Sequence, residues 1–308
     1  MYNETQTTVT EFLLLGIQNL KTFKYVYFVL LFVFYFVTIS GNLLIIWLVT
    51  ANRSLHTPMY FFLTQLSTSD VLMATNITPN TLSIVLKEKL AMSFAGCISQ
   101  FFFFCMTICV ECLILTAMAY DRYLAICYPL RYNSLINLRL CSKLAIISWI
   151  ISFSLTFIDT ITISQLRFCG HNVIDHFFCD LVPLLELACS DTSIVQIEVL
   201  IFCIPVVLFP LIVIPTSYIY IVLAILKISS ESGRQKAFST CSSHLTVVCL
   251  FYGTILAIYM LPNKGKSLTI SKVMSLLYTV LTPMSNPIIY SLRNNDIKEV
   301  IKMAFKLN

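Results

Sequence analysis

Charged residues are scarce in this sequence. Asp, Glu, Lys and Arg make up 11% of the 308 residues, whereas hydrophobic residues make up 58%. Charged residues supply about a quarter of an average soluble domain, so this composition excludes an ordinary soluble domain and indicates a protein that folds in lipid. Gly (7) and Pro (10) are also few, and no low-complexity tract occurs, which argues against a flexible linker. We therefore expect a single domain over residues 1–308.

Charge-free stretches long enough to span a membrane recur along the chain. A spanning helix needs about 20 largely apolar residues. Single acids interrupt three of the stretches, namely Asp70 in the second, Glu111 in the third and Asp159 in the fourth. The seven stretches lie at residues 25–52, 54–86, 90–120, 144–166, 199–226, 237–263 and 273–292. The sequence thus predicts an all-α membrane protein, a bundle of seven transmembrane helices.

Basic residues are distributed unevenly between the two sides of this bundle. If the N-terminus is outside, twelve of the twenty Lys and Arg residues fall on the cytoplasmic side, together with only four acids. This bias predicts an extracellular N-terminus over residues 1–24 and a short cytoplasmic tail over residues 293–308. The sequon Asn3-Glu4-Thr5 agrees, because glycosylation of Asn3 requires lumenal exposure. The apolar run at 12–17 is too short for a signal-peptide core, so we expect the first span to direct insertion. The basic residues form no continuous patch, which sets nucleic-acid binding aside.

The twelve cysteines fall into two groups. Eight lie in predicted helices or on the reducing side, where we expect them to be small packing residues. Cys97, Cys169, Cys179 and Cys189 lie outside, where oxidation is permitted. Four thiols allow three pairings, and the residues alone do not choose among them.

Six short motifs occur at matching places in the predicted helices. MAYDRYLAIC at 118–127 closes the third span, and GN at 41–42 lies in the first. LHTPMY at 55–60 enters the second span, SY at 217–218 lies late in the fifth, KAFSTC at 236–241 enters the sixth, and PMSNPIIY at 283–290 lies in the seventh. Together these motifs resemble those of the olfactory receptors, a family of rhodopsin-like G-protein-coupled receptors, and the resemblance runs through almost the whole chain.

The resemblance implies a receptor and not an enzyme, located in the plasma membrane of sensory cilia. A small volatile odorant would shift a conformational equilibrium and open an inner crevice for a heterotrimeric G protein of the stimulatory olfactory type, which raises cAMP. Arg122 would reach the G protein in the active state, with Asp121 holding it at rest. The resemblance also implies disulfides Cys97–Cys179 and Cys169–Cys189. The residues that it assigns to coupling and activation are Asp121, Arg122, Tyr123, Tyr218, Asn286, Pro287 and Tyr290.

Two departures from the wider rhodopsin-like pattern affect the expected mechanism. The sixth span carries Phe251-Tyr252-Gly253 where many relatives have a Trp and a kinking Pro, and no proline occurs between residues 237 and 261. A hinge of another kind is therefore expected. The inner end of this span offers Lys236 in place of an acid, so restraint of Arg122 at rest must come from elsewhere.

The acids within the spans need a partner or a function. An ionised side chain at the centre of a membrane helix costs about 2.5–3.5 kcal/mol on insertion scales. The resemblance places Asp70 and Glu111 together with Asn42 and Asn286, a set of oxygen ligands suited to a sodium ion, which is the one cofactor expected. The alternative is that one acid, Glu111 above all, is protonated and hydrogen-bonded. We expect Asp159 and Glu198, near the outer helix ends, to extend to the interface, with the binding of a ligand amine as the alternative.

The outer halves of the helices limit the ligand. No acid occurs at 98–110 in the third span, so a protonated amine is not favoured, and no lysine occurs at 273–292 to bind retinal. The expected cavity is mostly apolar, with polar groups on Tyr252, Tyr259 and Thr279, which favours a small neutral molecule with a single oxygen. The resemblance gives its lining as Phe104, Cys105, Ile108, Cys109, Phe202, Val206, Tyr252, Ile255, Tyr259 and Thr279.

Two other functions fit parts of the sequence. Buried carboxylates, and a fifth span that Pro205, Pro210 and Pro215 would break, are also features of secondary transporters, although no internal repeat is visible. His176 and Cys179 lie close enough in sequence to suggest a metal-assisted sensor, as in copper sites. Radiotracer uptake would separate a transporter from a receptor.

Overall fold

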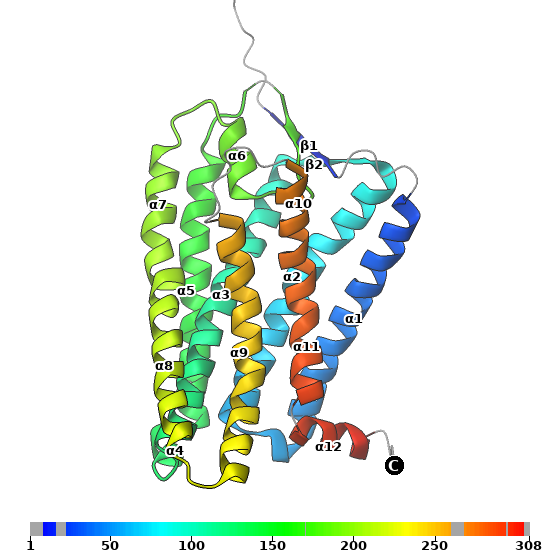
Figure 1. Cartoon of the computed structure of the whole chain (residues 1–308). Coiled ribbons are helices and arrows are strands. Elements are labelled where there is room, and N and C mark those ends of the chain that lie inside the picture. The colour runs from blue at the N-terminus through cyan, green and yellow to red at the C-terminus, as the bar shows by residue number, and fades with distance from the viewer. Residues whose placement is uncertain (1–8, 17–22, 170, 260–267, 294, 305–308) are drawn as a thin grey trace, which may run out of the picture.

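A bundle of long helices closed at one end by a small sheet makes up the computed structural model (Figure 1). The described residues are 9–16, 23–169, 171–259, 268–293 and 295–304. The seven columns of the bundle are α1 (Lys24–Ala51), α2 (Pro58–Lys87), α3 (Phe94–Cys127), α5 (Leu138–Ser164), α7–η2–α8 (Ser193–Cys203, Ile204–Leu208, Phe209–Leu226), α9 (Glu231–Tyr259) and α10–η3–α11 (Leu268–Leu276, Leu277–Leu281, Thr282–Arg293). The predicted all-α, seven-helix class is confirmed.

The outer surface of this bundle is apolar. Phe32 and Phe36 of α1, Ile150 of α5 and Ile212 of α8 are all more than half exposed. Within the described residues, four columns are long and apolar enough to cross a membrane by composition alone, namely α1, α3, α5 and α7–α8. Helix α2 is more polar because it faces inward, where Ser67, Ser69 and Asp70 are almost fully buried. The exposed apolar belt matches lipid as the surrounding solvent.

The prolines of the fifth column do not break it, contrary to the sequence-based expectation. The helix runs without interruption from Ser193 to Leu226. Pro205 lies in η2, a π-helical turn, and Pro210 lies in the first turn of α8. The wider turn accommodates the missing N–H of a proline, as π-bulges commonly do. A second π-helical turn, η3, interrupts the seventh column at Leu277–Leu281.

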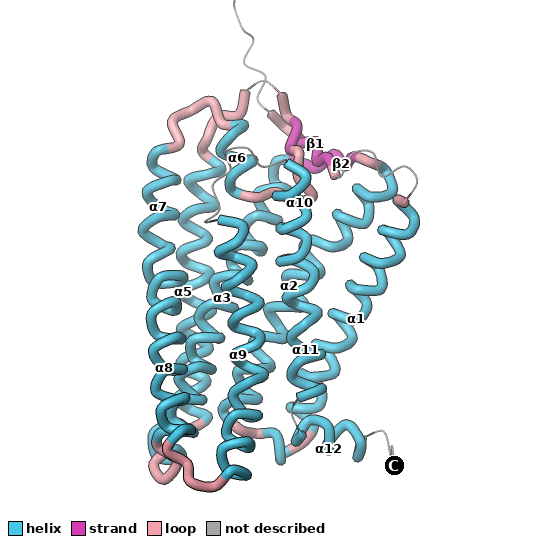
Figure 2. Tube along the Cα trace, viewed as in Figure 1, coloured by secondary structure: helices cyan, strands magenta, loops and turns pink. Residues whose placement is uncertain are grey.

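A three-stranded sheet covers one end of the bundle (Figure 2). Strand β1 (Glu11–Leu15) lies between β2 (Lys89–Ser93), to which it pairs antiparallel, and β3 (Val173–Ile174), to which it pairs parallel. Phe12 and Leu14 of β1 are fully buried, and the Phe12 ring lies 5.4 Å from that of Phe168. We call this sheet, with the loop residues 171–180, the lid, and the two ends of the bundle the lid end and the α12 end.

The lid corrects one predicted boundary. Residues 90–93 were expected to begin the third span, but they belong to β2, and α3 begins at Phe94. The Ser93 hydroxyl caps α3 by accepting a hydrogen bond from the Gly96 amide at 3.1 Å. Alternate residues of β1 face the core, so the apolar run at 12–17 contributes a strand.

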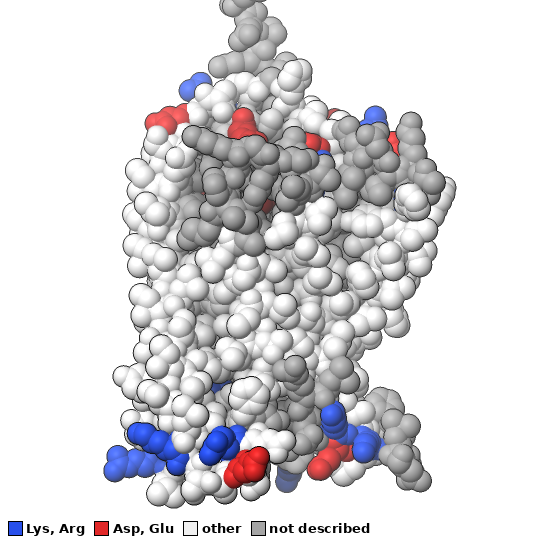
Figure 3. All heavy atoms as spheres, in the orientation of Figure 1, with Lys and Arg blue, Asp and Glu red and all other residues white. Residues whose placement is uncertain are grey.

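The opposite end carries short helices and most of the basic surface (Figure 3). Here lie η1 (Arg53–Leu55), α4 (Tyr132–Leu135) and α12 (Asn295–Ala304), while α6 (Leu181–Leu187) lies at the lid end. Helix α12 turns Ile297 and Val300 inward and leaves Lys298 and Lys302 exposed. The expected tail is thus an amphipathic helix against α11 and α1.

Candidate ligand cavity and coupling end

Two disulfides fasten the loop between α5 and α7. Cys97, in the first turn of α3, is bonded to Cys179, and Cys169 is bonded to Cys189, which is the pairing that the resemblance implied. The Cys179 amide also donates to Oε1 of Gln100 at 3.0 Å. Cys179 therefore has no free thiolate, and the described residues contain no cluster of three or more His, Cys, Asp or Glu side chains that could hold a metal ion. The suggestion of a metal-assisted sensor at this place is wrong.

The bonded loop places aromatic side chains over the bundle. The ring centroid of Phe178 lies 4.7 Å from that of Phe104 on α3 and 4.6 Å from that of His176. Nε2 of His176 lies 3.2 Å from the Ser275 hydroxyl on α10. His176 is 5% exposed, and this burial lowers the pKa of its imidazole to about 4, so the ring is neutral. We call His176, Phe177 and Phe178 the roof.

The residues expected to line the ligand cavity lie below this roof. Phe104, Val206, Tyr252, Ile255 and Thr279 are buried, and Cys105, Ile108, Cys109 and Phe202 are partly buried. The side chain of Tyr259 lies outside the described residues. The set thus faces the bundle and not the lipid.

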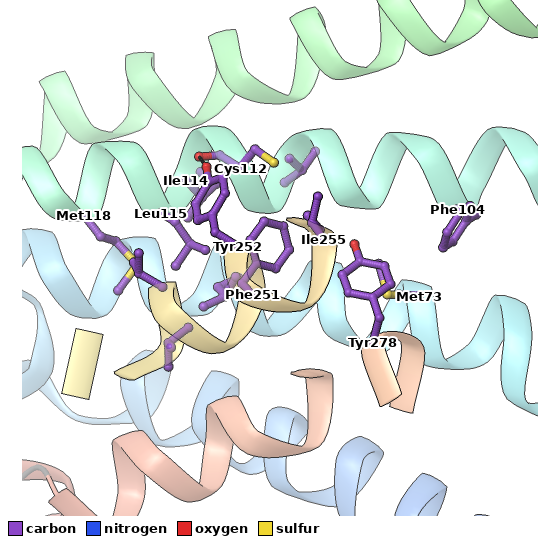
Figure 4. Packing of buried hydrophobic residues seen from close by; sticks show 14 of the residues in the cluster. Met73, Phe104, Cys112, Ile114, Leu115, Met118, Phe251, Tyr252, Ile255 and Tyr278 are labelled. Atoms are coloured by element: carbon purple, nitrogen blue, oxygen red, sulfur yellow. Dashed lines mark hydrogen bonds between the residues drawn. The ribbon is translucent and has the colours of Figure 1, made fainter. Parts of the chain in front are cut away.

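The two described polar groups of this set already bond to backbone. The Tyr252 hydroxyl donates to the Cys112 carbonyl at 3.4 Å, and the Thr279 hydroxyl donates to the Ser275 carbonyl at 2.9 Å. Figure 4 shows Tyr252 reaching from α9 toward Cys112 on α3. Each oxygen keeps a lone pair that can accept, so both groups suit a ligand that donates one hydrogen bond.

Sequence reasoning missed several members of this region. His176, Phe178 and Tyr278 were not among the expected lining, yet the Tyr278 ring lies 6.4 Å from that of Phe104 and 6.0 Å from that of Phe251. Proximity to Cys179 was the available signal for the two loop residues, because a disulfide to α3 must bring them next to that helix. Tyr278 lies in the π-helical turn η3. A projection that assumes a regular α-helix assigns the residues of such a turn to the wrong face of the helix.

The buried acids of the bundle meet in its middle. Both carboxylate oxygens of Asp70 accept from Nδ2 of Asn286, at 3.1 and 2.9 Å, and Glu111 interacts electrostatically with Asp70. Nδ2 of Asn42 donates to the Pro283 carbonyl at 3.0 Å. Oδ1 of Asn42 is buried without a hydrogen-bond partner among the described residues, and Glu111 has no donor there but lies within hydrogen-bonding reach of Asp70. Hard oxygen donors with open lone pairs are the chemistry that a sodium ion uses.

The other pair of acids lies between two neighbouring helices. Asp159 of α5 interacts electrostatically with Glu198 of α7, and Glu198 accepts a hydrogen bond from the Thr162 hydroxyl at 3.2 Å. One oxygen of each carboxylate is shielded from solvent, but both residues are only partly buried. Their extension to the interface stays a prediction.

The α12 end holds a buried ion pair. Arg122 is 8% exposed and Asp121 is fully buried, and Nε of Arg122 donates to Oδ2 of Asp121 at 3.0 Å. The other oxygen of Asp121 accepts from the Tyr132 hydroxyl of α4 at 2.6 Å. Tyr123 is partly exposed, and its hydroxyl lies 3.4 Å from that of Tyr128. The restraint on Arg122 that Lys236 does not provide thus comes from Asp121, which Tyr132 holds.

A second polar cluster joins α3, α8 and α9. Nε2 of His244 lies 3.2 Å from the Leu115 carbonyl, and Nδ1 lies 2.7 Å from the Tyr218 hydroxyl. A carbonyl can only accept, so Nε2 carries the proton and Nδ1 accepts from Tyr218. Pro287 and Tyr290, which follow Asn286 on α11, are also buried. The Tyr290 hydroxyl has no hydrogen-bond partner among the described residues. His244 was not predicted, because a single histidine in an apolar span gives no pattern.

A groove of about 120 Å³ lies between α1, α11 and α12 and includes Gly41, Pro287 and Ile301. It is separate from the expected ligand cavity. A Cβ at Gly41 would lie 3.1 Å from two atoms of Pro287, so this glycine allows close approach of α1 and α11.

Comparison with known proteins agrees with this geometry. The family model described as "Olfactory receptor" matches residues 31–307. The chain is 42% identical to Olfactory receptor 1468 of Rattus norvegicus (98% of this chain, 96% of that one) and 44% identical to Olfactory receptor 11L1 of Homo sapiens (99% and 95%). The fold is similar to that of squid rhodopsin, with a TM-score of 0.72 at 18% identity, over 92% of this chain and 86% of that one. This multi-pass membrane protein therefore belongs to the olfactory receptor family, whose members are receptors and not enzymes.

Proposed function

We propose that this chain is an odorant receptor that binds a small, mostly apolar molecule in the lid-end half of the bundle. Binding activates a heterotrimeric G protein of the stimulatory olfactory type at the α12 end and raises cAMP. The observation that carries the proposal is the buried, restrained Arg122 at the end opposite the roof. A buried cation held by one carboxylate is suited to release by a conformational change.

The ligand chemistry follows from the residues below the roof. Phe104, Val206 and Ile255 offer apolar surface, which favours a ligand held mainly by burial at about 25 cal/mol per Å². Tyr252 and Thr279 supply the oxygens that can orient one polar group. A neutral molecule with a single hydroxyl fits this set better than a charged one.

Coupling must be indirect. Eighteen residues separate Phe104 from Arg122 along α3, which is about 27 Å at ~1.5 Å per residue. An odorant therefore cannot contact Arg122, and its effect passes through a two-state equilibrium of the bundle. Tyr218 and Tyr290 lie near enough to interact with the Arg122 charge and would support the open form.

The proposed orientation places the lid outside the cell and α12 in the cytoplasm, in the membrane of sensory cilia. Exposed Arg53, Arg131, Arg139 and Lys227 at the α12 end support it through the positive-inside bias. Asn3, outside the described residues, would then be glycosylated. An epitope on the tail that stained intact, unpermeabilised cells would contradict this orientation.

A sodium ion completes the proposal. Asp70, Glu111, Asn42 and Asn286 would hold it in the inactive state, and it would supply the positive charge that two buried carboxylates lack. The unpartnered Oδ1 of Asn42 and the absence of a donor to Glu111 among the described residues support this assignment.

The test compares two substitutions in a cAMP reporter assay with a panel of volatile compounds. Arg122→Ala should reach the surface and lose cAMP production, whereas Phe104→Ala should change which compounds act. Arg131→Ala is the matched control, because Arg131 is an exposed arginine at the same end. A full response from Arg122→Ala at equal surface density would refute the coupling role. Accumulation of a radiolabelled agonist inside cells would instead favour a secondary transporter.

A further inference from the structure

Three distant parts of the chain meet at Lys272, in the lid-end half of α10. Nζ of Lys272 donates to the Gly16 carbonyl, next to β1, at 3.1 Å, and it forms an ion pair with Asp175, next to β3. Lys272 is only 5% exposed, although lysine is rarely buried. A buried cation with two anchored acceptors is expected to hold both in place.

The Gly16 carbonyl is fixed by its surroundings. A Cβ at Gly16 would lie 2.7 Å from Cγ2 of Ile84 on α2 and 3.2 Å from the Phe177 ring. The chain therefore passes between α2 and the roof where only glycine fits. β1 is bonded further to the loop, because the Leu13 amide donates to the Asn172 carbonyl at 2.8 Å and Nδ2 of Asn172 donates to the Glu11 carbonyl at 2.9 Å.

Asp175 connects this contact to the roof. It directly precedes His176, which approaches Ser275, three residues after Lys272 on α10. The ring of His176 packs on Phe178, and Phe178 packs on Phe104. The roof is thus attached to the seventh column at Lys272 and Ser275, and to α3 through the Cys97–Cys179 disulfide.

We propose that Lys272 is a positioning residue for the ligand, which holds the N-terminal segment and the roof closed over the cavity and so sets how fast odorant enters and leaves. This inference rests on the proposed function, because it requires that the odorant binds beneath the roof. The disulfide holds the roof to α3 permanently, whereas the ion pair can break and re-form. Opening therefore occurs on the side of the seventh column.

The first test measures how fast the cAMP response decays after agonist is washed out. Lys272→Met keeps the apolar stem but removes the charge, so we expect decay to be about tenfold faster, the ratio that corresponds to one charged hydrogen bond. Asp175→Asn should also make the decay faster, whereas Lys272→Arg, which keeps the charge, should leave the decay slow. Lys89→Met, at an exposed lysine of the same sheet, is the matched control. Decay of Lys272→Met at the wild-type rate, with a normal maximal response, would overturn the proposal.

The second test needs neither ligand nor delivery to the cell surface. Amide hydrogen exchange of the purified full-length chain should be about tenfold faster in β1 and at 173–179 for Lys272→Met, and unchanged in α3. Equal exchange in the two proteins would refute the role of Lys272 in holding the lid. Faster exchange without any odorant response would leave this role intact and count against the proposed function alone.

Discussion

Replacing Tyr132 with phenylalanine should raise the signal of the receptor in the absence of odorant. The Tyr132 hydroxyl donates to Oδ1 of Asp121 at 2.6 Å, while Oδ2 of Asp121 holds Arg122. Tyr132→Phe removes one oxygen and keeps the ring, so the packing of this half-buried ring against the core persists. Asp121 then loses one of its two hydrogen-bond partners and holds Arg122 less firmly.

The size of the effect follows from the hydrogen bond. Bonds to charged groups contribute ~1.5–3 kcal/mol, and each 1.4 kcal/mol is about tenfold in an equilibrium. Because Tyr132 is only half-buried, we expect the lower end of this range, so the ratio of active to resting receptor should rise about tenfold.

The assay is cAMP production without agonist, divided by surface receptor measured with an N-terminal epitope. Tyr128→Phe is the control, because Tyr128 belongs to the same loop and its hydroxyl contacts only that of Tyr123 among the described side chains. Basal cAMP of Tyr132→Phe equal to that of wild type would show that this bond does not restrain the resting state.

Three further outcomes are expected. Burial lowers the pKa of His176 to about 4 and raises the pKa of Asp180 to about 6. A fall from pH 7 to pH 5 should therefore destabilise the lid by ~2 kcal/mol through His176 and stabilise it by ~1 kcal/mol through Asp180. Asp180→Asn should therefore make hydrogen exchange at 173–179 more acid-sensitive, and an unchanged pH dependence would contradict this. Sodium should reduce agonist potency in wild type but not in Asp70→Asn, and equal sodium sensitivity of the two would exclude the proposed ion site. Phe12→Ala should destabilise the lid by ~3–5 kcal/mol, seen as local hydrogen exchange without loss of helical circular dichroism, whereas unchanged exchange would show that β1 is not held by its core contact.

The helices were predictable because lipid imposes one simple requirement on them. Absence of charge over about 20 residues identified every column, and the predicted ends at 52, 86 and 226 lie within one residue of the observed ends. The charge-free stretch of the third column ends at residue 120, yet α3 continues to Cys127 and includes the whole 118–127 motif, with Asp121 and Arg122 paired with each other.

The lid was not predictable by the same reasoning. Its strands have five, five and two residues, too few for an alternating pattern to stand out, and the pairing of β1 with β3 joins segments about 160 residues apart. Lys272 lies one residue before the predicted seventh span, and nothing in the sequence distinguishes it from other lysines that flank a span. Its role depends on Gly16 and Asp175, whose meeting is a property of the tertiary structure alone.

The central place of β1 makes residues 11–15 the part of the lid on which the other two strands depend. Its two edges pair with β2 and β3, so a truncation beyond Glu11 would leave both neighbours with unpaired backbone groups, whereas a tag joined before residue 9 would disturb none of these pairs. Sequence variation at a position such as Leu14, which is fully buried and is paired with Ile174 just ahead of the roof, would therefore displace the roof without changing any of its side chains.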